Sequence, residues 1–318
     1  MHAHNGGQQS QLAQEEIINF QPQWFKNALL QKPVSRRVPF RNSDLHFLDW
    51  GSPNEAALPV VLVHGDGAHA HWFDFVAPLL SERHHVIALD LPGMGDSGWF
   101  DTYSRDIMAD AIMEMIRAAG FTRRPGLIAH SFGGFISLLA AARHSTELAG
   151  LMICDFTVHP PAHHTEWYAD VHEPRSTRIY ETREAAIHRF RLMPEQPCAN
   201  QFILDHIAAH SLRQTAEGGW TWKFDPSIYP GFVIGRDLPD LFAGLTCPLA
   251  VMFGANSHDF DNMTRREANA YMCGLNPKAA FFEVPDARHH IMLDQPHAFA
   301  AGVAAQIGSW QIEGYFNG

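Results

Sequence analysis

Ser131 is the residue whose surroundings point most directly to nucleophilic chemistry. It stands in the stretch Ala129-His130-Ser131-Phe132-Gly133, where an apolar run ends and a helical pattern begins at once. A strand–turn–helix elbow of this kind holds a serine hydroxyl up as a nucleophile. Because the turn is tight, the residues two before and two after the serine must be small. Gly133 meets that demand better than Ala129, and a serine that only caps a helix is the alternative.

A serine becomes a good nucleophile only when a base takes its proton and a third group orients that base. Asp155 directly follows the apolar run 151–154, and His289 comes shortly after the apolar run 280–284. The chain order serine, acid, histidine is the one expected when an elbow serine lies in a parallel sheet. His290 stays open as the base and Asp259 as the acid.

The elements that must position these residues follow an alternating order. Continuous apolar runs, typical of strands buried on both faces, occur at 60–63, 86–89, 127–130, 151–154 and 249–253. Helical patterns occur between or after them, at 72–80, 106–119, 132–143, 261–272 and 297–310. Residues 34–40 and 45–50 read as an antiparallel hairpin at a sheet edge. The sequence therefore predicts an α/β fold, a mostly parallel central sheet with helices on both faces.

The alternation stops after residue 156 and resumes near residue 237. Some 80 residues without a buried strand are too many for a loop in a compact domain, so we expect an inserted helical cap with helices at 182–192 and 200–214. The predicted organisation is a flexible tail at 1–14, a core at 15–156 and 237–318, and a cap at 157–236. Aromatic residues of the cap could line an apolar pocket or form the cap's own core; they are Trp167, Tyr168, Trp220 and Trp222.

Stabilising the negative charge of a tetrahedral intermediate requires backbone N–H donors near the serine. One donor should be the amide of Phe132, at the start of the helix after the elbow. The second should be the amide of Asp66, which follows His64-Gly65 at the end of an apolar run. The carboxylate of Asp66 should then point away from the intermediate, and a plain tight turn is the alternative for this stretch.

Taken together, these motifs resemble those of the α/β-hydrolase fold, a serine esterase-like member with a helical cap. The resemblance runs from Trp24 to about Trp310 and rests on residues 64–65, 90–97, 129–134, 155 and 289–296, in that order. It implies that His289 is the base, because residues 289–296 are similar to the family's His-x-x-x-x-Glu-x-Pro signature. It also implies Asp155 as the acid, because some esterases of this fold place the acid there and have a later Gly-x-Asn-Ser loop, as residues 254–257 do.

Three positions depart from the family pattern. Ala129 replaces a glycine, Ser257 stands where an acid is commoner, and Arg288 stands where a glycine often precedes the base. The resemblance implies a hydrolase that cleaves a carboxylic ester, a lactone or a related acyl bond through an acyl-enzyme on Ser131. A cofactor-free dioxygenase or a C–C bond hydrolase that uses the His–Asp pair is the alternative, and a ligand receptor of the same fold is a third reading.

Composition narrows the choice of partners. The formal charge of −11 argues against nucleic acid or an anionic membrane, and no apolar run approaches the length of a membrane span. The four cysteines are far apart, and the 21 histidines show no ligand spacing typical of a metal motif. We therefore expect a cytoplasmic protein with a small apolar or aromatic acyl substrate and neither metal nor cofactor. A homodimer is compatible with the sequence.

Overall fold

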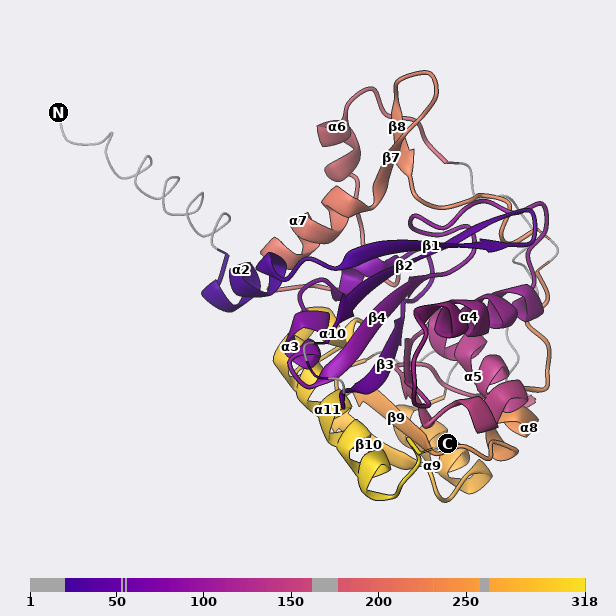
Figure 1. Cartoon of the computed structure of the whole chain (residues 1–318). Coiled ribbons are helices and arrows are strands. Elements are labelled where there is room, and N and C mark those ends of the chain that lie inside the picture. Colours follow the sequence, from indigo (N-terminus) through magenta and orange to yellow (C-terminus); the bar gives the residue numbers. More distant parts are fainter. Residues whose placement is uncertain are drawn as a thin grey trace.

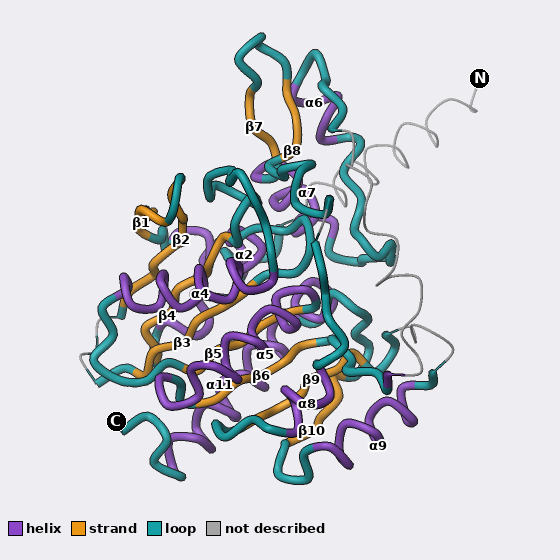
Figure 2. The backbone as a smooth tube through the Cα atoms, turned by 90° about the vertical axis from the view of Figure 1, so that its right-hand side faces the viewer, coloured by secondary structure: helices purple, strands orange, loops and turns teal. Residues whose placement is uncertain are grey.

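The computed structural model describes residues 21–52, 54, 56–161, 177–230, 232–257 and 263–317. Within these ranges the chain builds an eight-stranded sheet in the order β1-β2-β4-β3-β5-β6-β9-β10 (Figures 1 and 2). The strands are β1 (Val34–Phe40), β2 (Ser43–Gly51), β3 (Leu58–Val63), β4 (His84–Asp90), β5 (Gly126–His130), β6 (Gly150–Cys154), β9 (Leu249–Gly254) and β10 (Ala280–Val284). The pairs β1–β2 and β2–β4 are antiparallel and all other neighbours in the sheet are parallel. The predicted fold class and the edge hairpin are confirmed.

Helices cover both faces of the sheet. One face carries α4 (Arg105–Ala119), α5 (Phe132–His144), α8 (Leu238–Ala243) and α9 (Arg265–Leu275). The other carries α2 (Gln23–Leu30), α3 (Ala77–Ser81), α10 (Ile291–Asp294) and α11 (Pro296–Ile312). Two short 3₁₀ helices, η1 (Ala70–Phe73) and η2 (Ser145–Glu147), lie in connections. Figure 1 shows the two helical layers on opposite sides of the strands.

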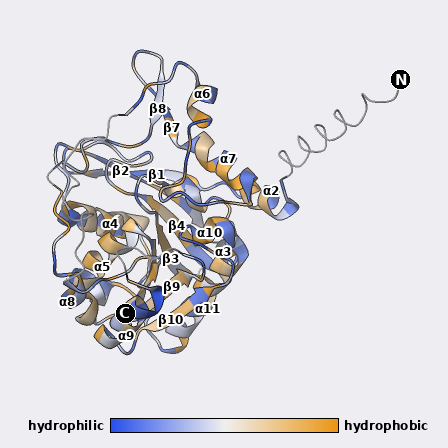
Figure 3. Cartoon of the chain, turned by 180° about the vertical axis from the view of Figure 1, so that it is seen from behind, coloured by the Kyte–Doolittle hydropathy of each residue, from blue (hydrophilic) through white to orange (hydrophobic). Residues whose placement is uncertain are grey.

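The sequence pattern explains why the central strands are buried on both sides. Along β3, Val61 and Val63 join the core under α4 and α5, whereas Val60 and Leu62 join the core under α3 and α11. Successive side chains of a strand point to opposite faces, so a continuous apolar run fills two cores at once. Figure 3 shows the hydrophobic residues gathered along these strands and the helices beside them.

Helix ends follow local chemistry. The hydroxyl of Ser104 accepts a hydrogen bond from the amide of Ile107 at the start of α4, and Gly120 ends the helix at a φ of 73°. Pro22 directly precedes α2. The predicted helix 72–80 is instead divided into η1 and α3, with Pro78 in the first turn of α3.

The segment between β6 and α8 corrects one expectation. Its helices α6 (Arg183–Ile187) and α7 (Gln201–His210) lie where helices were predicted, but residues 212–214 form strand β7 (Leu212–Gln214) rather than the end of a helix. β7 pairs with β8 (Trp220–Trp222) in an antiparallel hairpin. Gly218, at a φ of 91°, lies in the turn between them. We call residues 177–230 the inserted segment; in Figures 1 and 2 it extends beyond the sheet.

None of the helices in the described ranges has both the length and the apolar character needed to cross a bilayer.

Candidate active site

Ser131 occupies a strained turn between β5 and α5. Its φ of 51° and ψ of −122° lie in a backbone region that residues other than glycine rarely adopt. The turn is held by hydrogen bonds on both sides, from the Ser131 amide to the Cys154 carbonyl at 2.9 Å and from the Gly134 amide to the Ser131 carbonyl at 2.7 Å. The surrounding backbone therefore fixes the serine at the carboxyl edge of the sheet.

The requirement for small residues at the elbow is strongest at Gly133. A Cβ atom added there would lie 2.3 Å from the backbone carbonyl oxygen of His64, which is far inside van der Waals contact. Ala129, on the strand side of the elbow, is fully buried and pairs with Val63 of β3. The core therefore has room for the methyl group of an alanine at the position where the family usually has glycine.

The three side chains predicted for nucleophilic chemistry lie together and form a hydrogen-bonded chain. The Oγ of Ser131 is 2.9 Å from Nε2 of His289, and Nδ1 of His289 is 3.0 Å from Oδ1 of Asp155. Each residue comes from a different loop at the carboxyl edge of the sheet, after β5, β6 and β10. In this arrangement Nδ1–H donates to the carboxylate, so Nε2 can accept the serine proton.

Asp155 is buried and receives more hydrogen bonds than the sequence alone indicated. The amide of Gly254 donates to Oδ2 at 2.8 Å and the hydroxyl of Ser257 donates to Oδ1 at 2.6 Å. Burial alone would raise the pKa of Asp155, but the bond to His289, the nearby guanidinium of Arg265 and the Ser257 hydroxyl together lower it below its ordinary value. The carboxylate is therefore ionised at neutral pH.

Arg265, at the start of α9, is a neighbour of this carboxylate that sequence reasoning missed. Its Nη2 lies 3.6 Å from Oδ1 of Asp155, and its guanidinium carbon lies 4.1 Å from the centre of the Phe253 ring. The contact joins residues 110 positions apart, so no local pattern predicts it. Ser257 is predicted from the sequence as part of the Gly-x-Asn-Ser loop and as a departure from the commoner acid, but not as a hydrogen-bond donor to Asp155.

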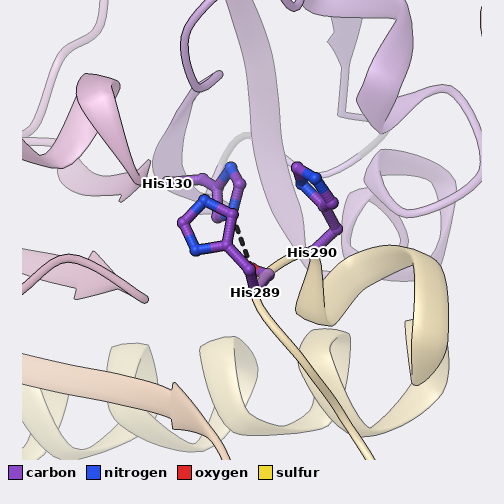
Figure 4. A group of neighbouring side chains, drawn as sticks. All are labelled: His130, His289 and His290. Atoms are coloured by element: carbon purple, nitrogen blue, oxygen red, sulfur yellow. Dashed lines mark hydrogen bonds between the residues drawn. The ribbon is translucent and has the colours of Figure 1, made fainter. Parts of the chain in front are cut away.

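Two further histidines surround His289 (Figure 4). Nε2 of His130 donates to the carbonyl oxygen of His289 at 2.8 Å, and this bond fixes the backbone of the predicted base. Burial, together with the nearby His289, lowers the pKa of His130 to about 3, so its ring is neutral. His290, the alternative base, directs Nε2 to the carbonyl oxygen of Pro194 at 3.3 Å. Of the two candidate bases, the structure brings His289 to Ser131.

These three imidazoles are also close enough to one another for a metal ion, since one nitrogen from each lies within 4.8 Å of the others. Nε2 of His289 is the nitrogen that faces Ser131. An ion bound to that nitrogen would remove the lone pair that a general base needs.

The loop after β3 lies directly beside the serine. A Cβ added to Gly65 would lie 3.2 Å from Cβ of Ser131, which brings the adjacent amide of Asp66 into the region of the nucleophile. The carboxylate of Asp66 accepts a hydrogen bond from the hydroxyl of Tyr229. Phe132 opens α5, and the first N–H groups of a helix have no partner within the helix. Gly65 therefore lies against Ser131, and the roles of the Phe132 and Asp66 amides in an oxyanion hole stay predictions.

The Asp90 loop supports this edge of the sheet. Asp90 is fully buried, accepts hydrogen bonds from the amides of Ala70 and Asp96, and pairs with Nδ1 of His46 at 2.6 Å. Nε2 of His64 accepts from the amide of Leu91 at 3.0 Å, which ties the loops after β3 and β4 together. These contacts give the loop after β4 a structural role at this edge of the sheet.

The remaining predicted residues divide into two groups. Asp259, Trp167 and Tyr168 lie outside the described residues. Trp220 and Trp222 lie on β8, where the Trp222 ring contacts Tyr180 and Phe190 and the Trp220 ring faces the guanidinium of Arg183. These contacts are within the inserted segment, and a role for the two tryptophans in the pocket stays a prediction.

The chain is similar to known hydrolases both in sequence and in fold. Residues 60–302 match the family described as the alpha/beta hydrolase family. An esterase of Mycobacterium tuberculosis, Rv0045c, is 26% identical over 265 residues, which are 79% of this chain and 82% of the esterase. A pimeloyl-[acyl-carrier protein] methyl ester esterase of Chromobacterium violaceum is 26% identical over 256 residues, or 78% and 93% of the two chains. Among solved structures, an E-2-(acetamidomethylene)succinate hydrolase superimposes with a TM-score of 0.72 at 22% identity, covering 87% of this chain and 99% of that one.

Proposed function

Because the chain belongs to the alpha/beta hydrolase family, we propose that it is a serine hydrolase that cleaves a carboxylic ester or a related acyl bond, such as a lactone. The hydrogen-bonded chain from Ser131 through His289 to Asp155 is the observation that carries the proposal. The ester-hydrolase names of the two relatives in Mycobacterium tuberculosis and Chromobacterium violaceum support the ester bond as the target.

The proposed reaction begins when Oγ of Ser131 attacks the ester carbonyl. Nε2 of His289 takes the hydroxyl proton and then gives it to the departing alcohol, which leaves an acyl-enzyme on the serine. A water molecule that loses its proton to His289 then attacks the acyl carbon, and Ser131 regains its proton as the acid leaves. Asp155 keeps the imidazole in the tautomer whose Nε2 is free to accept, and stabilises the imidazolium that forms.

The amides of Phe132 and Asp66 are proposed to bind the oxyanion of the tetrahedral intermediate. Both belong to loops that border Ser131, and the Phe132 amide also lies at the positive end of the α5 dipole. The hydrogen bond from Tyr229 occupies the Asp66 carboxylate, which supports a role for the Asp66 main chain rather than its side chain.

We propose Asp155 rather than Asp259 as the acid. The argument is geometric, because Asp155 contacts Nδ1 of His289 and also holds the amide of Gly254, so its carboxylate is fixed on two sides. The Ser257 hydroxyl adds a third hydrogen bond from the loop that would otherwise supply the acid.

Residues 157–236 are proposed to form a cap over this edge of the sheet. Three contacts to core loops support this, from Tyr229 to Asp66, from Lys223 to Asp96, and from Asp225 to Tyr103. A small apolar or aromatic acyl group is the proposed substrate, since the inserted segment is rich in aromatic rings. Trp220 and Trp222 are the pocket candidates within the described residues.

The test is hydrolysis of a series of p-nitrophenyl esters by the purified full chain. Wild-type protein should release p-nitrophenol, and Ser131→Ala should lose at least about 10³-fold in kcat/KM.

The same assay tests the choice of acid. Asp155→Asn should also lose about 10³-fold or more in kcat/KM, and Asp259→Asn should lose much less. Wild-type activity in Ser131→Ala would rule out the serine mechanism, and the reverse ranking of the two aspartates would overturn the acid assignment.

A further inference from the structure

A cluster of histidines and one aspartate joins the inserted segment to the core and shares no residue with the proposed catalytic residues. His71 lies in η1 and Asp74 directly follows that helix. His206 and His210 lie on α7, four residues apart and hence on one face of the helix. Their side chains line a cavity of about 320 Å³ together with residues that precede or belong to β1 and β2.

Asp74 holds this cluster together with one of its two oxygens. Oδ2 accepts from Nδ1 of His71 and from Nε2 of His206, both at 2.8 Å. Oδ1 is buried and has no hydrogen-bond partner among the described residues. Asp74 itself is only 8% exposed. A buried carboxylate oxygen without a partner is costly unless a ligand completes its environment.

His210 has one ring nitrogen whose lone pair is available to a ligand. Its Nδ1 lies 2.8 Å from the carbonyl oxygen of His206, which can only accept, so Nδ1 carries the proton and Nε2 carries the lone pair. Metal-binding histidines are typically oriented in this way, by a hydrogen bond from the second ring nitrogen to a carbonyl or carboxylate. The His210 ring stacks on His71 with centroids 4.3 Å apart.

We propose that His71, Asp74 and His210 bind a divalent transition-metal ion such as Zn²⁺. One ligand atom from each of the three lies within 4.8 Å of the others. Two imidazoles and a carboxylate are a donor set that suits first-row divalent ions rather than Ca²⁺ or Mg²⁺, which prefer oxygen ligands. His206 is assigned as a positioning residue, because its Nε2–H donates to Asp74 and it is not among the three residues whose ligand atoms lie within 4.8 Å of one another.

The charges around the cavity are mixed. Asp96 lines it and lies 3.9 Å from Nε2 of His71, but Lys223 forms an ion pair with Asp96 at 2.6 Å. Lys32 also lines the cavity. Asp74 has no such cationic Lys or Arg partner among the described residues, so its carboxylate is the one that an ion would neutralise.

Binding would draw the inserted segment onto the core. Ligand atoms around a tetrahedral Zn²⁺ lie about 3.3 Å apart, because each is about 2.0–2.2 Å from the ion. The three residues must therefore approach by up to about 1.5 Å, which moves α7 toward η1. The ion would link the inserted segment to the core. Any imidazole proton that the ion displaces would pass to solvent.

The test is calorimetric titration of untagged full-length protein, stripped with EDTA, with ZnCl₂. Wild type should bind one ion at this site and gain several degrees in Tm. His71→Asn keeps an N–H that can donate to Asp74 but removes the imidazole, and should weaken binding at least tenfold; His210→Asn should do the same.

The matched control is His206→Gln, whose amide N–H can replace Nε2–H at Asp74. It should retain Zn²⁺ binding within a few-fold, as should the exposed His188→Gln. All variants are compared for Tm without metal, so that loss of binding is separated from loss of folding. Unchanged Zn²⁺ binding in the His71→Asn/His210→Asn double variant would place the ion elsewhere and overturn the proposal. A loss of Zn²⁺ affinity in His206→Gln equal to that in His71→Asn would overturn it as well. Because the readouts are heat and Tm, failure of the ester-hydrolase proposal would leave this test intact.

Discussion

Asp155 is the residue at which most of the polar contacts of the candidate site converge. Its Oδ1 is shared by His289 and Ser257 and faces Arg265 at 3.6 Å, while Oδ2 receives the Gly254 amide. A carboxylate held from several sides cannot rotate away from the imidazole. Ser257, Gly254 and Arg265 thus hold the proposed acid in addition to its contact with His289.

Ser257→Ala removes one of these bonds and tests whether they matter. Because a hydrogen bond to a charged group is worth about 1.5–3 kcal/mol and other donors remain, we expect kcat to fall about tenfold with little change in KM. Steady-state kinetics on an aryl ester measures the change, with Ser309→Ala as control, because the hydroxyl of this half-buried serine on α11 donates to Glu313 and not to Asp155. Equal kcat values for Ser257→Ala and wild type would mean that this hydroxyl does not position Asp155.

Chain order predicted which loops would meet, because parallel strands end at one edge of a sheet, but the choice of His289 over His290 and of Asp155 over Asp259 came from the resemblance to the family. Ser131, Asp155 and His289 each follow a strand, and sequence shows that directly. The contacts of Arg265 and Ser257 with Asp155 could not be predicted, since they depend on how α9 and the loop after β9 lie across the sheet.

At the scale of elements, the elbow between β5 and α5 depends on how closely the helix approaches β3. Gly133 is the contact point, with no room for a methyl group against the His64 carbonyl. Gly133→Ala should lower the free energy of unfolding by about 1–3 kcal/mol through overpacking. It should also displace residues 64–66 and reduce esterase activity.

Gly274 provides the matched control, because it lies within α9 and a Cβ added there meets nothing within 4 Å. Gly274→Ala should keep activity and gain up to about 1 kcal/mol from helix propensity. Urea unfolding and ester hydrolysis measure both variants. Equal stability and activity in Gly133→Ala and Gly274→Ala would contradict the account of the elbow.

The sheet strands could be predicted to within about two residues, since continuous apolar runs have few other interpretations. The β7–β8 hairpin was missed because each strand is three residues long and its apolar pattern continues from α7. Gly218-Gly219 was the available signal for a turn. The four-residue α10 was also missed, because so short a helix has no periodicity.

At the scale of the whole molecule, the histidines bear on acid stability. Burial is the main cause that lowers the pKa of six of them, which are His64, His69, His84, His130, His210 and His290. Their unfolded pKa is near 6.5, so between that pH and their folded pKa the unfolded chain binds more protons. The free energy of unfolding should therefore fall as pH decreases from 7 to 5. His71, whose pKa is raised despite its burial because it pairs with Asp74, contributes in the opposite direction.

His130→Gln isolates the contribution of one histidine to the pH dependence of the free energy of unfolding. Its amide can still donate to the His289 carbonyl, but it does not titrate. With a folded pKa of about 3, the His130 ring accounts for about 2 kcal/mol of the stability lost between pH 7 and pH 5. Urea unfolding at several pH values, with EDTA present, should show a shallower slope for His130→Gln and an unchanged slope for the exposed His188→Gln. If the free energy of unfolding of His130→Gln depended on pH as steeply as that of the wild type, the His130 ring would not be the neutral, buried group described above.

The central claim is that Ser131 forms the covalent bond with an acyl group. The most direct measurement is intact-mass spectrometry of the full chain after reaction with an aryl fluorophosphonate, followed by peptide mapping. We predict a single adduct on Ser131, absent in Ser131→Ala and formed far more slowly in His289→Asn. An adduct on another residue, or no adduct on a preparation that hydrolyses esters, would contradict it.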